Sequence, residues 1–397
     1  MLIQIHTLQN YAPANLNRDD SGSPKDAMFG GFLRGRISSQ CLKRSIRRGE
    51  TSPFRVEFEK DGLLGERTKQ LPAIIREALA ALHADEKAID AIVVRAGELG
   101  RESRKTKNRD EEDGGEDAEN TASDTDVADV ATEAVVDGGT KQLIFIDRKT
   151  EAPRMAEILL ALYRKDAKAW AKLKPEEIAK ALGASVPRSV DIALFGRMTT
   201  SAALKNIQAS VQVAHALSTN AIKQEFDYYT AMDDLQADSE PGAGMIGDVE
   251  FNSACYYKYC NAHWEGLLSN VGGDIEIAQR AILALLEGFI FAQPSGKQNS
   301  FAAHNLPDFV LVEVSDKNLP VNYANAFLKP VKGFGDRTLM ENSVSALSNH
   351  VGRLSKVFSL TPNRAYLSVD GYGFMDLEPE PTLDGLKTWI RKQLPTK

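Results

Sequence analysis

Apolar and polar residues alternate in LIQIHTL (2–8), which predicts a strand at the start of the chain. Two longer stretches, about 69–95 and 151–183, repeat Leu, Ile and Ala at helical spacing and predict amphipathic helices. The apolar segment DIEIAQRAILALLEGFIFA (274–292) predicts a third long helix. Between the first two helical stretches, KQLIFID (141–147) predicts a short buried strand.

Three further apolar runs predict strands: SVDIALFGRM (189–198), EFNSACYYKYC (250–260) and DFVLVEVS (308–315). With a helix predicted near residues 39–48, the core elements follow one another as strand, helix, strand, strand, helix, strand. This is the split βαβ order of ferredoxin-like domains, which RNA-recognition modules share. The sequence therefore predicts an α+β fold with a ferredoxin-like (RRM-like) core and helical insertions.

The segment between the first strand and the first helix is rich in Asn, Asp, Gly and Pro, which predicts a loop over residues 10–35. Ser38 or Ser39 is placed to cap the helix that follows, and Leu42 and Ile46 lie one turn apart on its buried face. At about 100° per residue, the opposite arc carries only polar and basic side chains. These are Gln40, Lys43, Arg44, Arg47 and Arg48.

Basic residues extend upstream from this helix, and RGRISSQCLKRSIRR (34–48) contains no acid. The acids between Arg18 and Arg48 are Asp19, Asp20 and Asp26. A cationic groove of this kind would bind phosphate backbones without sequence preference, whereas a single basic helix face is commonly only solvated. The cations that could line the groove are Arg18, Lys25, Arg34, Arg36, Lys43, Arg44, Arg47 and Arg48.

The formal net charge of -7 hides this basic character. Residues 110–137 contain twelve Asp or Glu and no Lys or Arg, so the rest of the chain carries -7 + 12 = +5. An acidic segment without aromatic residues buries too little apolar surface to offset its ordering entropy, which predicts a disordered loop from about 103 to 139. It either solubilises the protein or mimics nucleic acid in a basic groove.

A second polar loop, QPSGKQNSFAAHN (293–305), combines Gly296, Lys297 and Gln298, which suit contact with a phosphate backbone. It does not match the Walker A pattern, and a simple turn with a solvated lysine is the alternative. Aromatic residues could stack on bases, although tyrosines on strands are more commonly packed. The candidates are Phe226, Tyr228, Tyr229, Tyr256, Tyr257 and Tyr259.

Motifs for catalysis or metal binding are weak. Six histidines are scattered without metal-ligand spacing, three cysteines form no CxxC pair, and Asp233 and Asp234 more commonly cap or bridge than hold a metal. We therefore predict no catalytic residue, metal or cofactor. No run approaches the ~18 apolar residues of a membrane span, and the start lacks a signal-peptide pattern, so we expect a cytoplasmic protein without membrane contact.

Seven segments together resemble the CasC family, the repeated backbone subunit of the type I-E CRISPR Cascade complex. The resemblance runs from residue 2 to the tail; each segment alone is weak, but together they are specific. The segments are NRDD (17–20), KDAMFGG (25–31), RISSQCLKR (36–44), VDIALFGRM (190–198), YYTAMDDL (228–235), GKQNSFA (296–302) and PTLDGLKTWIR (381–391). The acidic insertion departs from what we expect of this family.

The resemblance implies a hand-shaped subunit with an RRM-like palm (1–50 and 186–397), a thumb (about 199–229) and helical fingers (51–185). Several copies would stack head to tail along a CRISPR RNA, beside other Cascade subunits. Each thumb would fold over the guide held by a neighbouring copy and displace one base at regular intervals. Target DNA would be recognised through pairing with the guide.

The resemblance also implies residue roles. Met198 would lie near the guide bases, and Lys297 and Gln298 would bind the backbone. The remaining guide contacts would be Arg18, Lys25, Ser38, Gln40, Lys43, Arg44 and Arg47. Two alternatives remain: a metal-dependent ribonuclease acting through Asp233 and Asp234, or through His6 and His215, and a stand-alone single-stranded RNA-binding protein.

Overall fold

A computed structural model describes residues 1–100, 140, 143–183, 187–199, 201, 203–231 and 245–396. The predicted acidic loop lies outside these described residues. The fold is mixed α+β, and the chain divides into two compact units. The sheet unit comprises Met1–Arg55, Gln212–His263 and Ile282–Lys397, and the helical unit comprises Val56–Val211 and Trp264–Ala281.

Nine strands of the described residues form one antiparallel sheet, in which neighbours follow the order β11-β10-β1-β9-β7-β3-β2. Strand β1 lies between β9 and β10, and its residues 2–9 are buried. β6 and β8 also pair with β9. The strands are β1 (Leu2–Ala14), β2 (Asp26–Phe29), β3 (Phe32–Ile37), β6 (Val211–Val213), β7 (Ala216–Ser218), β8 (Glu225–Ala231), β9 (Met245–His263), β10 (Phe309–Ser315) and β11 (Asn363–Ser368).

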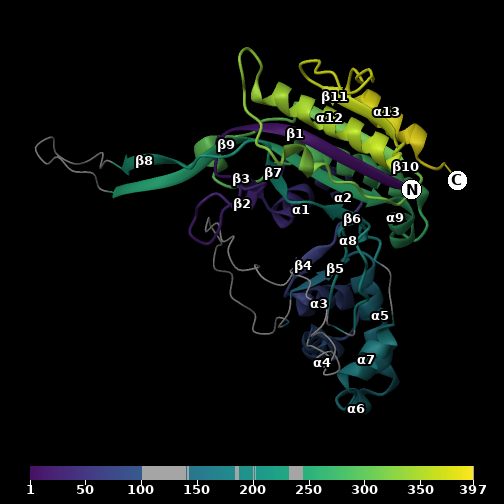
Figure 1. Cartoon of the computed structure of the whole chain (residues 1–397). Coiled ribbons are helices and arrows are strands. Elements are labelled where there is room, and N and C mark those ends of the chain that lie inside the picture. Colours follow the sequence, from purple (N-terminus) through teal and green to yellow (C-terminus); the bar gives the residue numbers. More distant parts are fainter. Residues whose placement is uncertain are drawn as a thin grey trace, which may run out of the picture. The chain divides into compact units, whose positions relative to one another are not determined.

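Helices cover both faces of this sheet, as Figure 1 shows for α12 (Leu339–Phe358). On that face, Tyr257 of β9 and Leu347 of α12 belong to one buried cluster. The next residue of β9, Lys258, points to the opposite face, where its ammonium lies 5.0 Å from the ring centre of Phe289 in α10 (Ile275–Phe291). α1 (Ser39–Arg48) also packs there, because Ile46 contacts α10 at Gly288.

The helical unit has its own apolar core, built mainly from α3 (Leu71–Ala81), α4 (Glu86–Ala96), α5 (Glu151–Lys165) and α7 (Pro175–Leu182). A short ribbon of β4 (Glu66–Thr68) and β5 (Ile144–Ile146) adjoins it. The predicted helices at 69–95 and 151–183 are each interrupted by an Asp that caps a new helix. Asp85 caps α4, and Asp166 caps α6 (Ala167–Trp170).

The predicted strand at 189–198 is wrong, because Val190–Phe195 form the helix α8. All six of its residues are buried, and a short, continuously apolar run cannot distinguish a strand from a buried helix. The Asp191 carboxylate accepts a hydrogen bond from the Gly65 N–H at 2.8 Å, and Gly196 (φ +78°) ends the helix.

The other core predictions are confirmed: β1, α1, β5, β9, α10 and β10 lie where the patterns placed them. The sequence interpretation missed β2 and β3 inside the predicted 10–35 loop, and it assigned no elements after residue 315. The remaining elements are α2 (Pro53–Glu59), η1 (Gly97–Gly100), α9 (Trp264–Asn270), α11 (Gln298–Phe301), η4 (Ala324–Phe327) and α13 (Leu383–Gln393). Among the described residues, no helix has the length and apolarity needed to span a bilayer.

Candidate nucleic-acid interface

Asn17 connects three of the segments predicted to contact nucleic acid. Its side-chain oxygen accepts a hydrogen bond from the Ser38 N–H at 2.8 Å, and its carbonyl accepts one from the Lys25 N–H at 2.8 Å. Lys25 is tied in turn to β3, because its carbonyl accepts from the Arg36 N–H at 2.9 Å. The structure therefore brings Lys25, the start of α1 and Arg18, which follows Asn17 in the chain, together in the sheet unit.

The second predicted loop packs directly against the first. A Cβ at Gly296 would lie 2.3 Å from the carbonyl oxygen of Leu16 and 2.7 Å from that of Asn15, so only glycine allows this approach. The next residue, Lys297, is exposed and left-handed (φ +50°). The Gln298 side chain donates to the Pro294 carbonyl at 2.9 Å, which shapes the turn that presents Lys297.

Asp19, the acid beside Arg18, is used within its own turn. Its carboxylate accepts hydrogen bonds from the Ser21 hydroxyl at 2.7 Å and from the Ser21 and Ser23 N–H groups at 2.9 and 3.0 Å. These bonds, above all the one from the Ser21 hydroxyl, lower the pKa of Asp19 below its ordinary value. The carboxylate therefore organises the loop through an Asx turn.

Helix α1 begins as predicted. Its N-cap is Ser38, whose hydroxyl accepts from the Cys41 N–H at 3.2 Å, and Leu42 and Ile46 are buried. Gln40, Arg44 and Arg48 are exposed, and Lys43 is half-buried.

The prediction that Arg47 lies on the solvent-facing arc of α1 is wrong, because only 5% of the residue is exposed. The buried arc of α1 is wider than predicted and reaches residue 47, about 100° beyond Ile46 on the helix.

The prediction that Arg34 lines the cationic groove is also wrong, because Arg34 is fully buried. Its guanidinium donates to the carbonyls of Ser218 (2.9 Å), Thr219 (2.8 Å), Phe327 (2.6 Å) and Leu328 (3.3 Å). Burial lowers the pKa of this guanidinium from its ordinary value. Arg34 therefore joins β3, β7 and η4 and is left out of the candidate interface.

Arg36 is half-buried and holds the β2–β3 hairpin. Its Nε donates to the Asp26 carbonyl at 3.0 Å, and its Nη1 lies 3.1 Å from Nδ1 of His215. We call the remaining accessible set the basic surface. It consists of Arg18, Lys25, Gln40, Lys43, Arg44, Lys297 and Gln298.

Met198 belongs to the helical unit and is 90% exposed, so it is not part of a core. The residue before it is buried: Arg197 makes a paired contact with the Glu151 carboxylate at 2.6 and 2.9 Å and donates to the Phe145 carbonyl at 3.0 Å. This pair fixes the backbone that presents Met198. Sequence reasoning missed this structural role of Arg197, although a Gly-Arg dipeptide directly after an apolar run was a usable signal.

The aromatic candidates separate into two groups. Tyr256, Tyr257 and Tyr259 are buried in β9, so they do not present faces for bases. Phe226 and Tyr228 of β8 are 62% and 65% exposed. They lie on the ribbon that β8 forms with the first part of β9, from the Glu225–Phe251 pair to the Ala231–Met245 pair, and Figure 1 shows this ribbon extending beyond the rest of the sheet.

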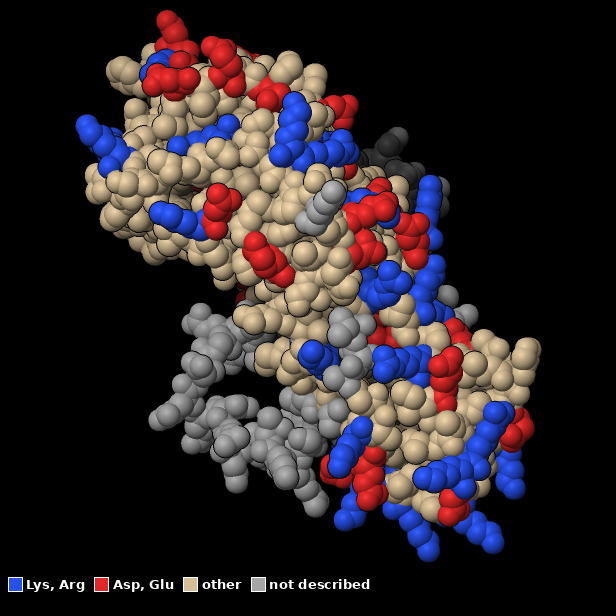
Figure 2. Space-filling model, turned by 90° about the vertical axis from the view of Figure 1, so that its right-hand side faces the viewer, with Lys and Arg blue, Asp and Glu red and all other residues tan. Residues whose placement is uncertain are grey.

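Sequence reasoning also missed a second cationic area, on the helical unit. Figure 2 shows Lys and Arg side chains, with some Asp and Glu among them, on the helical unit that contains α5 to α7. The signal was their repetition along the second predicted helix. The exposed cations of these helices and their connections are Arg164, Lys165, Lys168, Lys172, Lys174 and Lys180.

Little in the described residues favours the ribonuclease alternative. His6 is fully buried, with its Nδ1 2.8 Å from the Tyr257 hydroxyl and its Nε2 3.5 Å from the Glu313 carboxylate, so it is unavailable to a substrate. His215 is exposed beside Arg36. Asp233 and Asp234 lie outside the described residues. Within the described part, no group of three or more His, Cys, Asp or Glu could hold a metal.

The chain is similar in fold to chains of two solved structures. One is titled "CRISPR RNA-guided surveillance complex, pre-nicking"; it is 24% identical, covers 98% of this chain and 100% of its own, and has a TM-score of 0.71. The other is titled "CRISPR RNA-guided surveillance complex" and is 22% identical, with the same coverage and a TM-score of 0.56.

Comparison with curated proteins gave no match. A family model described as "CT1975-like protein" matches residues 3–389, which is nearly the whole chain. On this match, the chain belongs to the Cas_CT1975 family of CT1975-like proteins.

Proposed function

We propose that this protein is the CasC-type backbone subunit of a type I-E Cascade complex, and that it binds CRISPR RNA without a catalytic role. The observation that carries the proposal is the convergence of separate basic segments in the sheet unit. Hydrogen bonds of Asn17 join the loop that carries Arg18 and Lys25 to the start of α1, and Gly296 packs the Lys297 loop against the same region.

The fold supports the proposal in three ways. The neighbour order β10-β1-β9-β7, with α1 and α10 in the connections, agrees with a ferredoxin-like palm in which β7 takes the place predicted for residues 189–198. The β8–β9 ribbon, with exposed Phe226 and Tyr228, suits a thumb, and the helical unit suits fingers. The two similar solved chains, each covered over its whole length, come from structures titled RNA-guided surveillance complexes.

In this proposal the basic surface neutralises guide phosphates and releases counterions, which gives affinity without reading sequence. Met198 would contact bases from a backbone held by the Arg197–Glu151 pair. Several copies would follow one guide beside other Cascade subunits. Pairing of the guide with target DNA would then supply the sequence specificity.

Salt-dependent binding of labelled single-stranded RNA tests this proposal. For single strands, each lost phosphate contact reduces the slope of log K against log salt by about 0.7. Arg44→Ala combined with Lys297→Ala should therefore reduce the slope by about 1.4. Lys356→Ala, an exposed cation of α12 on the other face of the sheet, is the matched control and should leave the slope unchanged. Equal slopes for all three proteins would contradict the proposal.

A further inference from the structure

The loop between η4 and α12 presents an aromatic side chain to solvent. Phe334 is 86% exposed. Its N–H and carbonyl exchange hydrogen bonds with the carbonyl and N–H of Arg337, both at 3.1 Å, across a tight turn in which Gly335 has φ +59°. Phe334 therefore stands directly before a defined two-residue turn, paired with Arg337 on its other side.

The base of this loop is anchored to the sheet unit. Arg34 donates to the Leu328 carbonyl, the Val331 N–H donates to the Thr219 carbonyl at 2.9 Å, and the Asn342 side chain donates to the Lys332 carbonyl at 2.9 Å. These bonds fix the loop before any partner arrives. An aromatic residue held in this way loses little conformational entropy when it docks.

The loop is also cationic. Lys329 and Lys332 are exposed, and Arg337, at the end of the turn, forms an ion pair with Glu341 at 2.8 Å. Residues 328–337 carry three cations and one acid, Asp336, which gives 3 - 1 = +2. A partner for this loop should therefore offer an apolar or aromatic cavity with an acidic border.

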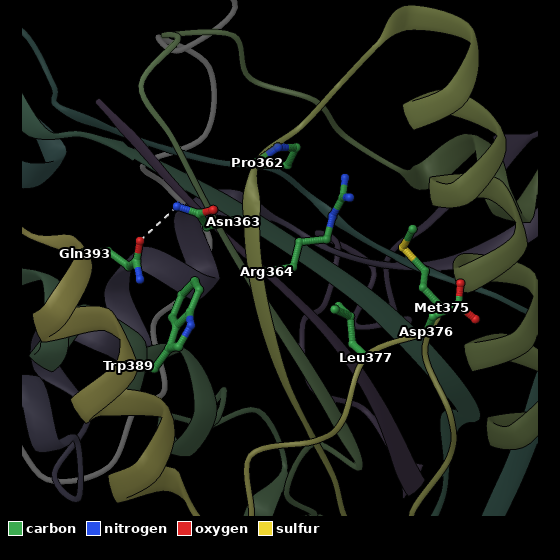
Figure 3. A pocket seen from close by; sticks show the side chains of 8 residues that line it. All are labelled: Pro362, Asn363, Arg364, Met375, Asp376, Leu377, Trp389 and Gln393. Carbon is green, nitrogen blue, oxygen red and sulfur yellow. Dashed lines mark hydrogen bonds between the residues drawn. The ribbon is translucent and has the colours of Figure 1, made fainter.

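The same unit contains a pocket with these properties, at the edge of the sheet. Its volume is about 510 Å³, and Figure 3 shows Trp389 of α13 on one side, Met375 and Leu377 on the other, and Arg364 of β11 between them. The Asn363 side chain donates to the Gln393 side chain at 3.0 Å and closes one end. Arg364 is occupied, because it donates to Glu313 and Ser355.

The segments that form this pocket are rich in acids. Asp376 lines the pocket and is exposed, Glu378 and Glu380 follow Asp376 in the chain, and Asp384 lies in the first turn of α13, the helix that carries Trp389. Figure 2 shows acidic side chains gathered at the end of the molecule where Figure 1 draws the segment between β11 and α13. An acidic border repels nucleic acid and attracts a cationic protein loop.

We propose that Phe334 of one copy inserts into the Trp389 pocket of a second copy, with Lys329 and Lys332 facing the acidic border. The inference rests on the proposed function, since it names a contact between neighbouring backbone subunits. Each copy carries one loop and one pocket, so the same contact can repeat from copy to copy. It is separate from the basic surface and from the β8–β9 ribbon.

Cross-linking between two variants, each with one introduced surface cysteine, tests the contact. Both variants carry Cys41→Ser, because Cys41 is the one native cysteine that is not buried in the described structure. One variant adds Phe334→Cys and the other adds Leu377→Cys, and they are mixed and oxidised with and without an RNA long enough for several copies. The matched control replaces Leu377→Cys by Leu319→Cys, another exposed leucine of the sheet unit.

We expect the Phe334–Leu377 mixture to form a disulfide-linked dimer several-fold faster than the control mixture. Phe334→Ala in the native chain should raise the dissociation constant for self-association about tenfold or more, as expected for an aromatic anchor. Its affinity for an RNA that holds one copy should not change. Cross-linking no faster than the control would overturn the inference.

Two further outcomes separate the inference from the proposed function. If Phe334→Ala weakens binding of the short RNA and leaves self-association intact, the loop stacks on nucleic acid and the inference is wrong. If native protein binds no RNA but the specific cross-link forms, the copy-to-copy contact stands and the proposed function fails.

Discussion

The sheet interior and the surface of α1 both contain cations, but the two regions use them differently. Arg34 and Lys258 are buried and donate to backbone carbonyls, Lys258 to that of Phe289 at 2.8 Å. Arg44 and Arg48 of α1 face solvent. Residue type alone therefore does not separate a structural cation from one that can bind a phosphate. The position of the residue on its strand or helix determines which of the two it is.

The largest expected effect is that of Arg34→Ala. It removes the guanidinium that donates to the carbonyls of Ser218, Thr219 and Phe327 in a buried region, and of the three the Thr219 carbonyl keeps its second donor, the Val331 N–H. We expect the free energy of unfolding to fall by about 3–5 kcal/mol, the range seen when one partner of a buried charged contact is removed. Denaturant titration followed by circular dichroism measures this.

The matched control for that variant is Arg44→Ala on the exposed face of α1. Its free energy of unfolding should change by less than about 0.5 kcal/mol. A loss below about 1 kcal/mol in Arg34→Ala would mean that the buried carbonyls find other donors, and the comparison between interior and surface would collapse.

Lys258 predicts a pH dependence of stability. Burial lowers the pKa of its ammonium to about 7, from 10.5 in an exposed lysine. Between these values the unfolded chain binds the proton and the folded chain does not, so stability rises with pH through this window; below about 7 the full cost of the buried charge is present.

Thermal or denaturant unfolding of native protein and Lys258→Met at several pH values measures this effect. Relative to the variant, the native protein should gain on the order of 2 kcal/mol from pH 7 to 9, at about 1.36 kcal/mol per unit. The difference in the free energy of unfolding between native protein and variant isolates the contribution of Lys258, because the tyrosines and cysteines are the same in both. Parallel stability curves would show that Lys258 keeps its ordinary pKa.

Arg47 tests the boundary between the two regions. The resemblance implies that Arg47 contacts the guide, whereas its exposure of 5% shows that it belongs to the buried arc of α1. Arg47→Ala should lower the free energy of unfolding by about 1–2 kcal/mol through lost packing of its aliphatic stem. The salt slope of RNA binding should remain that of the native chain; a reduced slope with unchanged stability would return Arg47 to the basic surface.

The smallest effects belong to the accessible cations of α1. Lys43→Ala and Arg44→Ala should each weaken RNA binding modestly and reduce the salt slope by about 0.7, because each removes one phosphate contact. Anisotropy titrations at several salt concentrations measure both quantities. Arg353→Ala, an exposed arginine of α12, serves as the control of equal charge and should match the native slope.

Much of the fold follows from local pattern. The alternation in residues 2–8, the Ser38 cap and the long apolar helix at 274–292 located β1, α1 and α10 correctly. Residues 190–195 were misassigned because a fully buried helix carries no amphipathic period. The 10–35 segment hid β2 and β3, because its turn-forming composition was taken for a loop, although Gly30 and Gly31 join the two strands in a two-residue hairpin turn. Only the pairing of β3 with β7 joins segments far apart in the chain.

The candidate site was predictable in part. Charge and turn composition identified the two loops, but not that Gly296 lets one pack on the carbonyls of Asn15 and Leu16. The burial of Arg34 depends on carbonyls of residues 218, 219, 327 and 328, which no local pattern reveals. A helical wheel assigned Arg47 to solvent because it cannot show how much of a helix its neighbours cover.

The central claim, that copies of this chain assemble on a guide RNA, is tested most directly by co-expressing it with a CRISPR array and measuring the purified product. Light scattering gives the molar mass, and absorbance at two wavelengths gives the nucleic-acid content. We predict a uniform particle with one length of RNA and a mass several times the 43.5 kDa of one chain. A monomer of 43.5 kDa without nucleic acid would contradict the account.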